Sequence, residues 1–108
     1  MDMQTHQDKL SIHIVIGAAY DYTSVNQFFE IMRTVQFEPA EIELDFSATL
    51  HADSSALGML LHLRSVYPQS RVLLANCKPS IYRLFYIAKL QDVFILESPL
   101  DKIETIAA

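Results

Sequence analysis

Strict alternation of apolar and polar residues predicts two strands in this chain. Residues 10–16 carry leucine or isoleucine at every second position, and residues 41–47 repeat the pattern with Ile42, Leu44 and Phe46. Successive side chains of a strand point to opposite faces, so each of these segments is expected to lay one face on a core. Two short apolar runs, residues 71–75 and 93–96, are typical of buried strands.

Between the strands, apolar residues recur every three or four positions, the spacing that gives a helix one buried stripe. Proline lies at the start or just past the end of several of these segments, as its missing N–H group favours. Helices are therefore predicted at residues 25–32, 54–66 and 79–88, with a short last helix starting at Ser98, Pro99, Leu100 and Asp101. This alternation predicts an α/β fold, with a mixed, mostly parallel β-sheet flanked by about four α-helices.

Composition indicates one domain over residues 1–108, with residues 1–9 a flexible or edge segment. The single Cys77 excludes an internal disulfide, which favours the reducing cytoplasm. The polar start is unlike a signal peptide, and no apolar run approaches the roughly 20 residues that span a bilayer. The net charge of −5 argues against nucleic acid as the main partner.

The stretch 51–61 contains the residues with most chemical interest. Asp53, Ser54 and Ser55 stand where a strand leads into a helix, and such residues cap the free N–H groups of a first helical turn. The same position favours a negative charge, so a phosphate on Ser54 would be well placed. The long helix that follows is apolar more than halfway round. We expect Leu57, Leu60 and Leu61 to face the sheet and Met59, Leu63 and Val66 to face outward. The helix is then either deeply buried or presents a patch to a partner.

Enzymatic chemistry is not expected from these residues. His51, Asp53 and Ser54 are close in sequence, but a catalytic nucleophile and its base are normally brought together by the fold, and no Gly-x-Ser-x-Gly elbow is present. With two glycines in the chain, no phosphate-binding loop can form. His51 and His62 have no second ligand at a metal-site spacing. No cofactor or metal is therefore predicted, and His13 is expected only to lie on the open face of its strand.

Residues 45–58 resemble the core motif of STAS domains, the anti-sigma factor antagonists. The family pattern, roughly D-L-S-G-V-x-x-I-D-S-S-G-L-G, fits without a gap, and the elements from about residue 10 to residue 106 follow the family's order. The resemblance implies the STAS fold and phosphorylation of Ser54 by a partner kinase. Ala56 replaces a family glycine and could crowd a partner. Asp21 matches an acidic position that the family carries close to the phosphosite, but it could equally be a turn residue capping its own backbone.

The resemblance further implies a switch between binding partners. Unmodified, the domain would bind an anti-sigma factor, usually itself a serine kinase, and so free a sigma factor. A metal-dependent serine phosphatase would reverse the phosphorylation. The alternative is a STAS subunit that does not cycle phosphate and docks on the ATPase of a lipid-transport ABC system. Self-association stays open. The residues expected to bind the partner are Asp21, Asp53, Ser54, Ser55, Met59 and Leu63.

Overall fold

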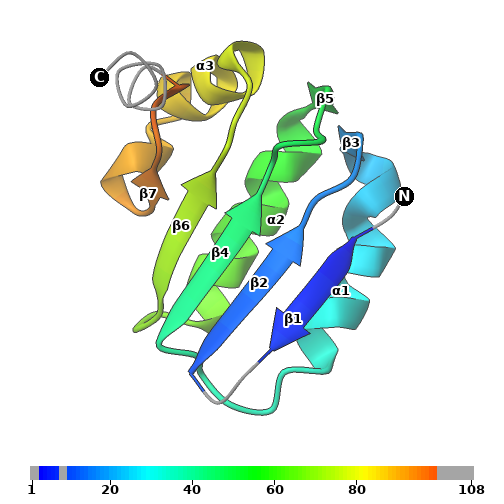
Figure 1. Ribbon diagram of the computed structural model, residues 1–108, viewed down its shortest axis with the longest axis vertical. Coiled ribbons are helices and arrows are strands. Elements are labelled where there is room, and N and C mark those ends of the chain that lie inside the picture. Colours follow the sequence, from blue (N-terminus) through cyan, green and yellow to red (C-terminus); the bar gives the residue numbers. More distant parts are fainter. Residues whose placement is uncertain (1–2, 8–9, 100–108) are drawn as a thin grey trace.

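The computed structural model describes residues 3–7 and 10–99, which form one five-stranded sheet, a small two-stranded sheet and three α-helices (Figure 1). The strand order of the large sheet is β1-β2-β4-β6-β7. All neighbours are parallel except β1, which pairs antiparallel with β2 at one edge. The strands are β1 Gln4–Gln7, β2 Ser11–Val15, β4 Glu41–Asp45, β6 Arg71–Ala75 and β7 Ile95–Leu96. The predicted mixed, mostly parallel α/β fold is confirmed.

The helices connect these parallel strands. They are α1 Val25–Arg33, α2 Ser54–Val66 and α3 Pro79–Ile87, with 3₁₀ turns η1 Tyr22–Ser24 and η2 Leu90–Asp92. Each α-helix lies where the apolar spacing predicts one. The short helix predicted from Ser98 falls mainly on residues 100–108, outside the described residues. No helix in the described ranges combines the length and the apolar character needed to cross a bilayer.

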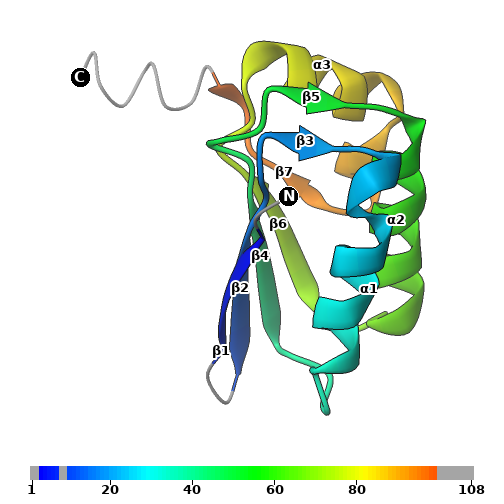
Figure 2. The ribbon, with the colours of Figure 1, turned by 90° about the vertical axis from the view of Figure 1, so that its right-hand side faces the viewer.

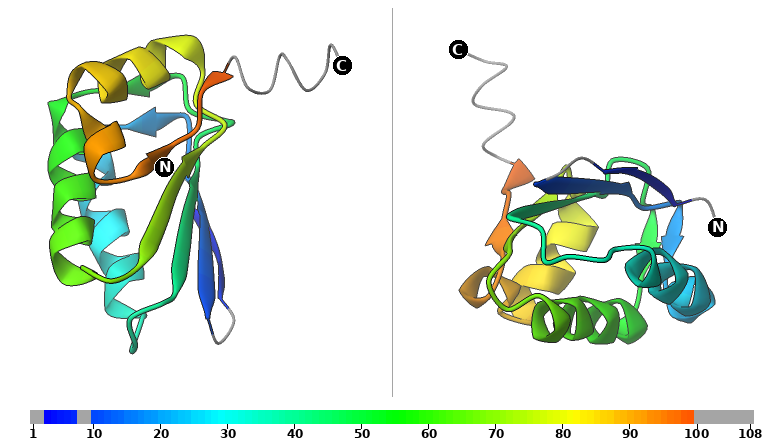
Figure 3. Two further views of the ribbon diagram at one scale, coloured as in Figure 1. Left: turned by 90° about the vertical axis from the view of Figure 1, so that its left-hand side faces the viewer. Right: turned by 90° about the horizontal axis from the view of Figure 1, so that it is seen from below.

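The helices and the sheet form two layers. In Figure 2 the helices lie together on one side of the sheet, and the view from below in Figure 3 shows the same separation. Among the described elements, none covers the opposite face. The core therefore lies between the layers, where large apolar side chains from both are fully buried: Ile16, Phe28, Leu44, Phe46, Leu60, Leu63, Leu74 and Phe85.

A second, two-stranded sheet extends from the carboxyl ends of β2 and β4. It consists of β3 Ala19–Tyr20 and β5 His51–Ala52, which run parallel (Figure 1). Just before it, the amides of Leu50 and His51 both donate to the Ala18 carbonyl, at 2.8 and 3.1 Å. Two-residue strands are too short to leave an alternating pattern, so the sequence did not predict them. Their pairing brings the segments that precede α1 and α2 side by side.

The structure corrects the predicted orientation of α2. Met59 and Leu63 are 2% and 1% exposed and pack in the core, whereas Leu61 is 51% exposed. The outward orientation expected for Met59 and Leu63 is therefore wrong, and so is the inward orientation expected for Leu61. Leu60 is buried and Val66 is exposed, as predicted. Apolar residues surround most of α2, so periodicity left several faces possible. The packing of α2 against the sheet and α1 selects the face that contains Met59, Leu60 and Leu63.

Ala56 is also corrected. Its side chain is fully buried in the core. The concern that Ala56 crowds a partner is wrong, because its methyl group points into the protein. The family glycine is replaced here at a position that affects packing beneath α2 and not the surface above it.

Candidate functional site

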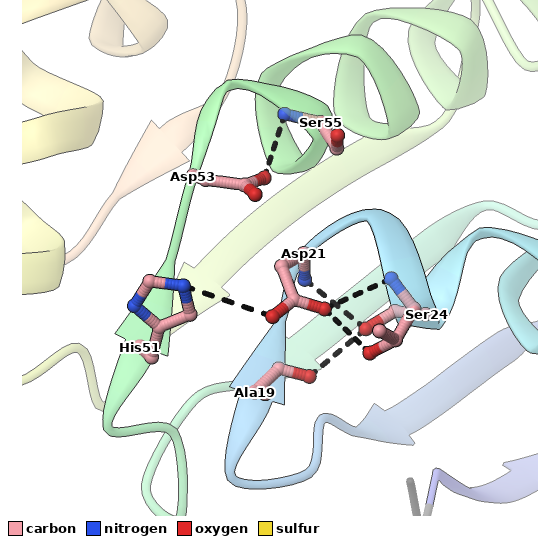
Figure 4. A network of polar contacts seen from close by, with 7 residues as sticks. Ala19, Asp21, Ser24, His51, Asp53 and Ser55 are labelled. Atoms are coloured by element: carbon pink, nitrogen blue, oxygen red, sulfur yellow. Dashed lines mark hydrogen bonds and ion pairs between the residues drawn. The ribbon is translucent and has the colours of Figure 1, made fainter.

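Ser54 is the first residue of α2 and is exposed. Asp53 precedes it as the N-cap, with an extended backbone (φ −130°, ψ −169°), and its carboxylate accepts a 2.8 Å hydrogen bond from the Ser55 amide (Figure 4). The two neighbours therefore differ in role. Asp53 satisfies a free N–H group of the helix, whereas Ser54 presents its hydroxyl to solvent at the positive end of the α2 dipole.

Asp21 lies beside this site and caps its own turn. Its Oδ1 accepts from the amide and the hydroxyl of Thr23, at 2.9 and 2.5 Å, and its amide donates to Ser24 Oγ at 3.1 Å. The interpretation of Asp21 as a turn residue is therefore correct. The Thr23 hydroxyl is the main reason why the pKa of Asp21 is lowered; burial opposes the shift, and His51 adds to it. Asp21 is thus a carboxylate at neutral pH.

The pairing of β3 with β5 also brings Asp21 toward Asp53. Asp21 Oδ2 lies 3.7 Å from His51 Nε2, and Asp21, His51 and Asp53 each offer a ligand atom within 4.8 Å of the others (Figure 4). The expected closeness of Asp21 to the Ser54 loop is present in the structure. The contact with His51 was not predicted, because Asp21 and His51 are far apart in sequence and meet only through the two short strands.

An exposed stripe continues from Ser54 along α2. Ser54, Gly58, Leu61 and Ser65 are all exposed and follow one another at intervals of four, three and four residues, which places them on one side of the helix. We call this stripe the Ser54 face. Apart from its chain neighbours and the adjoining backbone of α2, a Cβ atom added at Gly58 would meet no atom within 4 Å, so the stripe is open there. Tyr22, in the turn after Asp21, is 72% exposed at the same end of the molecule.

Comparison with known proteins gives concordant results. A family model described as the STAS domain matches residues 1–104. A STAS-domain containing protein of Pseudomonas aeruginosa (strain UCBPP-PA14) is 29% identical over 89 residues, which are 81% of this chain and 88% of that protein.

Solved structures with the same fold include two forms of one protein. The anti-sigma factor antagonist SpoIIAA in its unphosphorylated form superposes with a TM-score of 0.76 at 19% identity, covering 98% of this chain and 96% of that one. The phosphorylated form of SpoIIAA, a cell fate determinant of Bacillus, gives 0.68 at 20% identity, with coverages of 97% and 99%. At these identities, the likeness establishes the architecture only.

Proposed function

Because the chain belongs to the STAS domain family, we propose that it is an anti-sigma factor antagonist whose binding is switched off by phosphorylation of Ser54. Unmodified, it binds an anti-sigma factor of the serine-kinase type and thereby releases a sigma factor. The anti-sigma factor phosphorylates Ser54, and a metal-dependent serine phosphatase removes the phosphate. The chain itself acts as a binding protein in the cytoplasm and not as an enzyme.

The observation that carries this proposal is the position of Ser54. Its hydroxyl is exposed, it begins α2, and it starts the Ser54 face. A kinase can reach such a hydroxyl without unfolding the domain, and a partner seated on the Ser54 face would cover it. Ser55 is the competing acceptor, but it is only partly exposed.

The charge added by phosphorylation is large enough to control binding. A phosphate brings about −1.5 to −2 charges at neutral pH. Each unit charge facing a partner carboxylate about 4 Å away costs about 4 kcal/mol at a partly dehydrated surface. About 1.4 kcal/mol already changes an equilibrium constant tenfold. Asp21 and Asp53 make the site acidic beforehand, so the modification strengthens an existing negative potential.

The fold tolerates the same charge. The N-terminus of α2 stabilises a negative group, and Asp53 keeps its own hydrogen bond to Ser55. Phosphorylation therefore changes the surface while α2 stays capped. This is the property that a reversible switch between partners requires.

The partner surface proposed here includes Asp21, Asp53, Ser54 and Ser55 together with Leu61. Leu61 takes the place of Met59 and Leu63, which are buried. An exposed leucine two turns farther along the same face of α2 offers apolar area whose burial stabilises a complex. Asp21 contributes charge close to the phosphate position.

Affinity capture with the unmodified protein, followed by mass spectrometry, tests the choice of partner. The proposal expects a serine-kinase anti-sigma factor. Capture of a transporter ATPase, with no phosphate transferred to the chain, would instead support the STAS subunit that does not cycle phosphate.

The captured kinase and ATP then test the site. Wild type and Ser55→Ala should take up one phosphate, and Ser54→Ala none. Ser54→Ala should bind the unmodified partner as wild type does, whereas Ser54→Glu should bind at least about tenfold more weakly. Phosphate on Ser55, or equal affinity of all Ser54 variants, contradicts the mechanism.

A further inference from the structure

A cluster outside the Ser54 site lies on the face of the sheet opposite the helices, which none of the described elements covers. In Figure 1 this face is toward the viewer, with α1 and α2 behind it. Burial alternates along β2 and β4: Ile12, Ile14, Ile42 and Leu44 point to the helices, so the residues between them point the other way. The parallel register pairs His13 with Glu43 and Val15 with Asp45. One histidine and two carboxylates are thus carried by two neighbouring strands inside the sheet.

The distances within this cluster are close to those between ligands of one metal ion. His13 Nε2 lies 3.1 Å from Glu43 Oε2 and 3.6 Å from Asp45 Oδ2. One ligand atom from each of the three side chains lies within 4.8 Å of the others. Two ligand atoms about 2.1 Å from the same ion are about 3.0–3.4 Å apart in octahedral or tetrahedral coordination. The cluster needs only small side-chain adjustments to reach that geometry.

Further contacts orient the Asp45 carboxylate. Its Oδ1 accepts from Asn76 Nδ2 at 3.0 Å and from the Ser47 amide at 2.9 Å, so Oδ2 is the oxygen that faces His13. Carboxylates that ligate a metal ion are commonly held in place by such hydrogen bonds. Asn76 has φ 61° at the end of β6, a conformation that asparagine tolerates better than most residues.

We propose that His13, Glu43 and Asp45 bind a divalent transition metal ion of the zinc type on the face of the sheet opposite the helices. Imidazole and carboxylate groups together suit zinc, and three protein ligands leave a fourth position for water or for a group from a partner. The two carboxylates and the net charge of −5 favour a cation there.

The second trio with ligand atoms in reach, Asp21, His51 and Asp53, is the weaker candidate. Asp53 caps the N-terminus of α2, where the helix dipole disfavours a cation. Asp21 belongs to a turn and not to a sheet strand, and its carboxylate already holds Thr23. The site at His13 does not depend on the proposed function, because it shares no residue with the Ser54 site.

The test is a titration of untagged protein, freed of metals by a chelator, with zinc chloride at pH 7.5 in a calorimeter. Wild type should bind one zinc ion per chain in a saturable manner. Co²⁺ in the same position should give d–d absorption that differs in wavelength and intensity from that of Co²⁺ in buffer. No saturable binding in wild type, or a Co²⁺ spectrum identical to that in buffer, would overturn the proposal.

Variants locate the site. His13→Gln and Glu43→Gln should each weaken zinc binding at least about tenfold, with circular dichroism confirming that both remain folded. Asn76→Gly removes the supporting amide, keeps a residue suited to positive φ, and should weaken binding by about tenfold. His62→Gln, an exposed histidine of α2, is the matched control and should bind as wild type. Retention of binding by His13→Gln, or its loss in His51→Gln instead, would refute the assignment.

Discussion

At the scale of single residues, Asp53 and Ser54 show how a structural role and a regulatory role can sit side by side. Asp53 holds the first turn of α2 through the Ser55 amide, and Ser54 remains exposed. Modification of Ser54 therefore leaves the cap intact. If the serine itself were the cap, a phosphate would alter the bond that starts the helix.

Replacing the two residues separately should reveal this division. Asp53→Ala should lower the free energy of unfolding by about 1 kcal/mol, the usual cost of a lost N-cap. Ser54→Ala should change it by less than about 0.5 kcal/mol, as is usual for an exposed residue. Urea denaturation followed by circular dichroism measures both. A larger loss for Ser54→Ala than for Asp53→Ala would show that the cap is assigned to the wrong residue.

Cys77 illustrates the opposite case, a reactive group kept inert by its surroundings. Burial, with help from the negative charges of Glu97 and Asp45, raises the pKa of its thiol to about 12. At pH 8 only about one thiol in ten thousand is then ionised, and the thiolate is the nucleophile. We expect native protein to resist iodoacetamide at pH 8 and protein in 6–8 M urea (roughly the range that unfolds small domains) to react completely. Mass spectrometry after a timed quench distinguishes the two; rapid labelling of folded protein would contradict the burial of Cys77.

At the scale of secondary-structure elements, α2 marks the limit of what the sequence alone can predict. Its existence and its start at Asp53 and Ser54 follow from local signals: a capping residue, then a long apolar run ended by Pro68. Its orientation does not. Leucine or methionine occupies positions 57, 59, 60, 61 and 63, so several faces are almost equally apolar. Only the sheet and α1 decide which face is buried, and neither is local to the helix.

Two adjacent leucines of α2 give a matched test of this orientation. Leu60 is fully buried and Leu61 is 51% exposed. Leu60→Ala should lower the free energy of unfolding by about 2–5 kcal/mol, because it leaves a cavity in the core. Leu61→Ala should change it by at most about 0.5 kcal/mol and instead weaken binding of the unmodified partner. Equal destabilisation by both variants in a urea titration would contradict the observed faces of α2.

At the scale of the whole molecule, both clusters of interacting polar groups depend on the parallel topology. The alternation of strands and helices predicts that topology, because the spacing of apolar residues in each segment shows whether it forms a strand or a helix. It does not predict that Asp21 meets His51 or that His13 meets Glu43, since each pair is separated by 30 residues and is brought together only by the pairing of strands. Sequence motifs for metal and catalytic sites cover short stretches of chain. They therefore miss ligands that lie far apart in sequence and that neighbouring strands of a sheet bring together.

The same dependence on the whole fold can be measured through the pH dependence of unfolding. The pKa of Asp21 is lower in the folded chain than its ordinary value of 3.8, mainly through the Thr23 hydroxyl. The native state therefore binds fewer protons than the unfolded state. The stabilisation is present above the unfolded pKa and is lost as the pH falls through the folded one. We expect the midpoint of thermal unfolding to fall as the pH drops from about 5 to about 2.

Asp21→Asn keeps an oxygen that can accept the hydrogen bonds from Thr23 but removes the titration, so its midpoint should fall less steeply over the same range. Thr23→Val should flatten the dependence as well, and the double variant should add little to Asp21→Asn, since both act on one carboxylate. Ser54→Ala removes no group that titrates in this range, so its midpoint of thermal unfolding should change with pH in parallel with that of wild type. The protonation of Asp21 affects the global unfolding transition only if η1 unfolds together with the sheet. If the turn opens by itself, Asp21 is protonated without changing the midpoint of global unfolding. Parallel curves for wild type and Asp21→Asn would show that the turn opens independently, and Asp21 would then act on the Ser54 site without contributing to the stability of the fold.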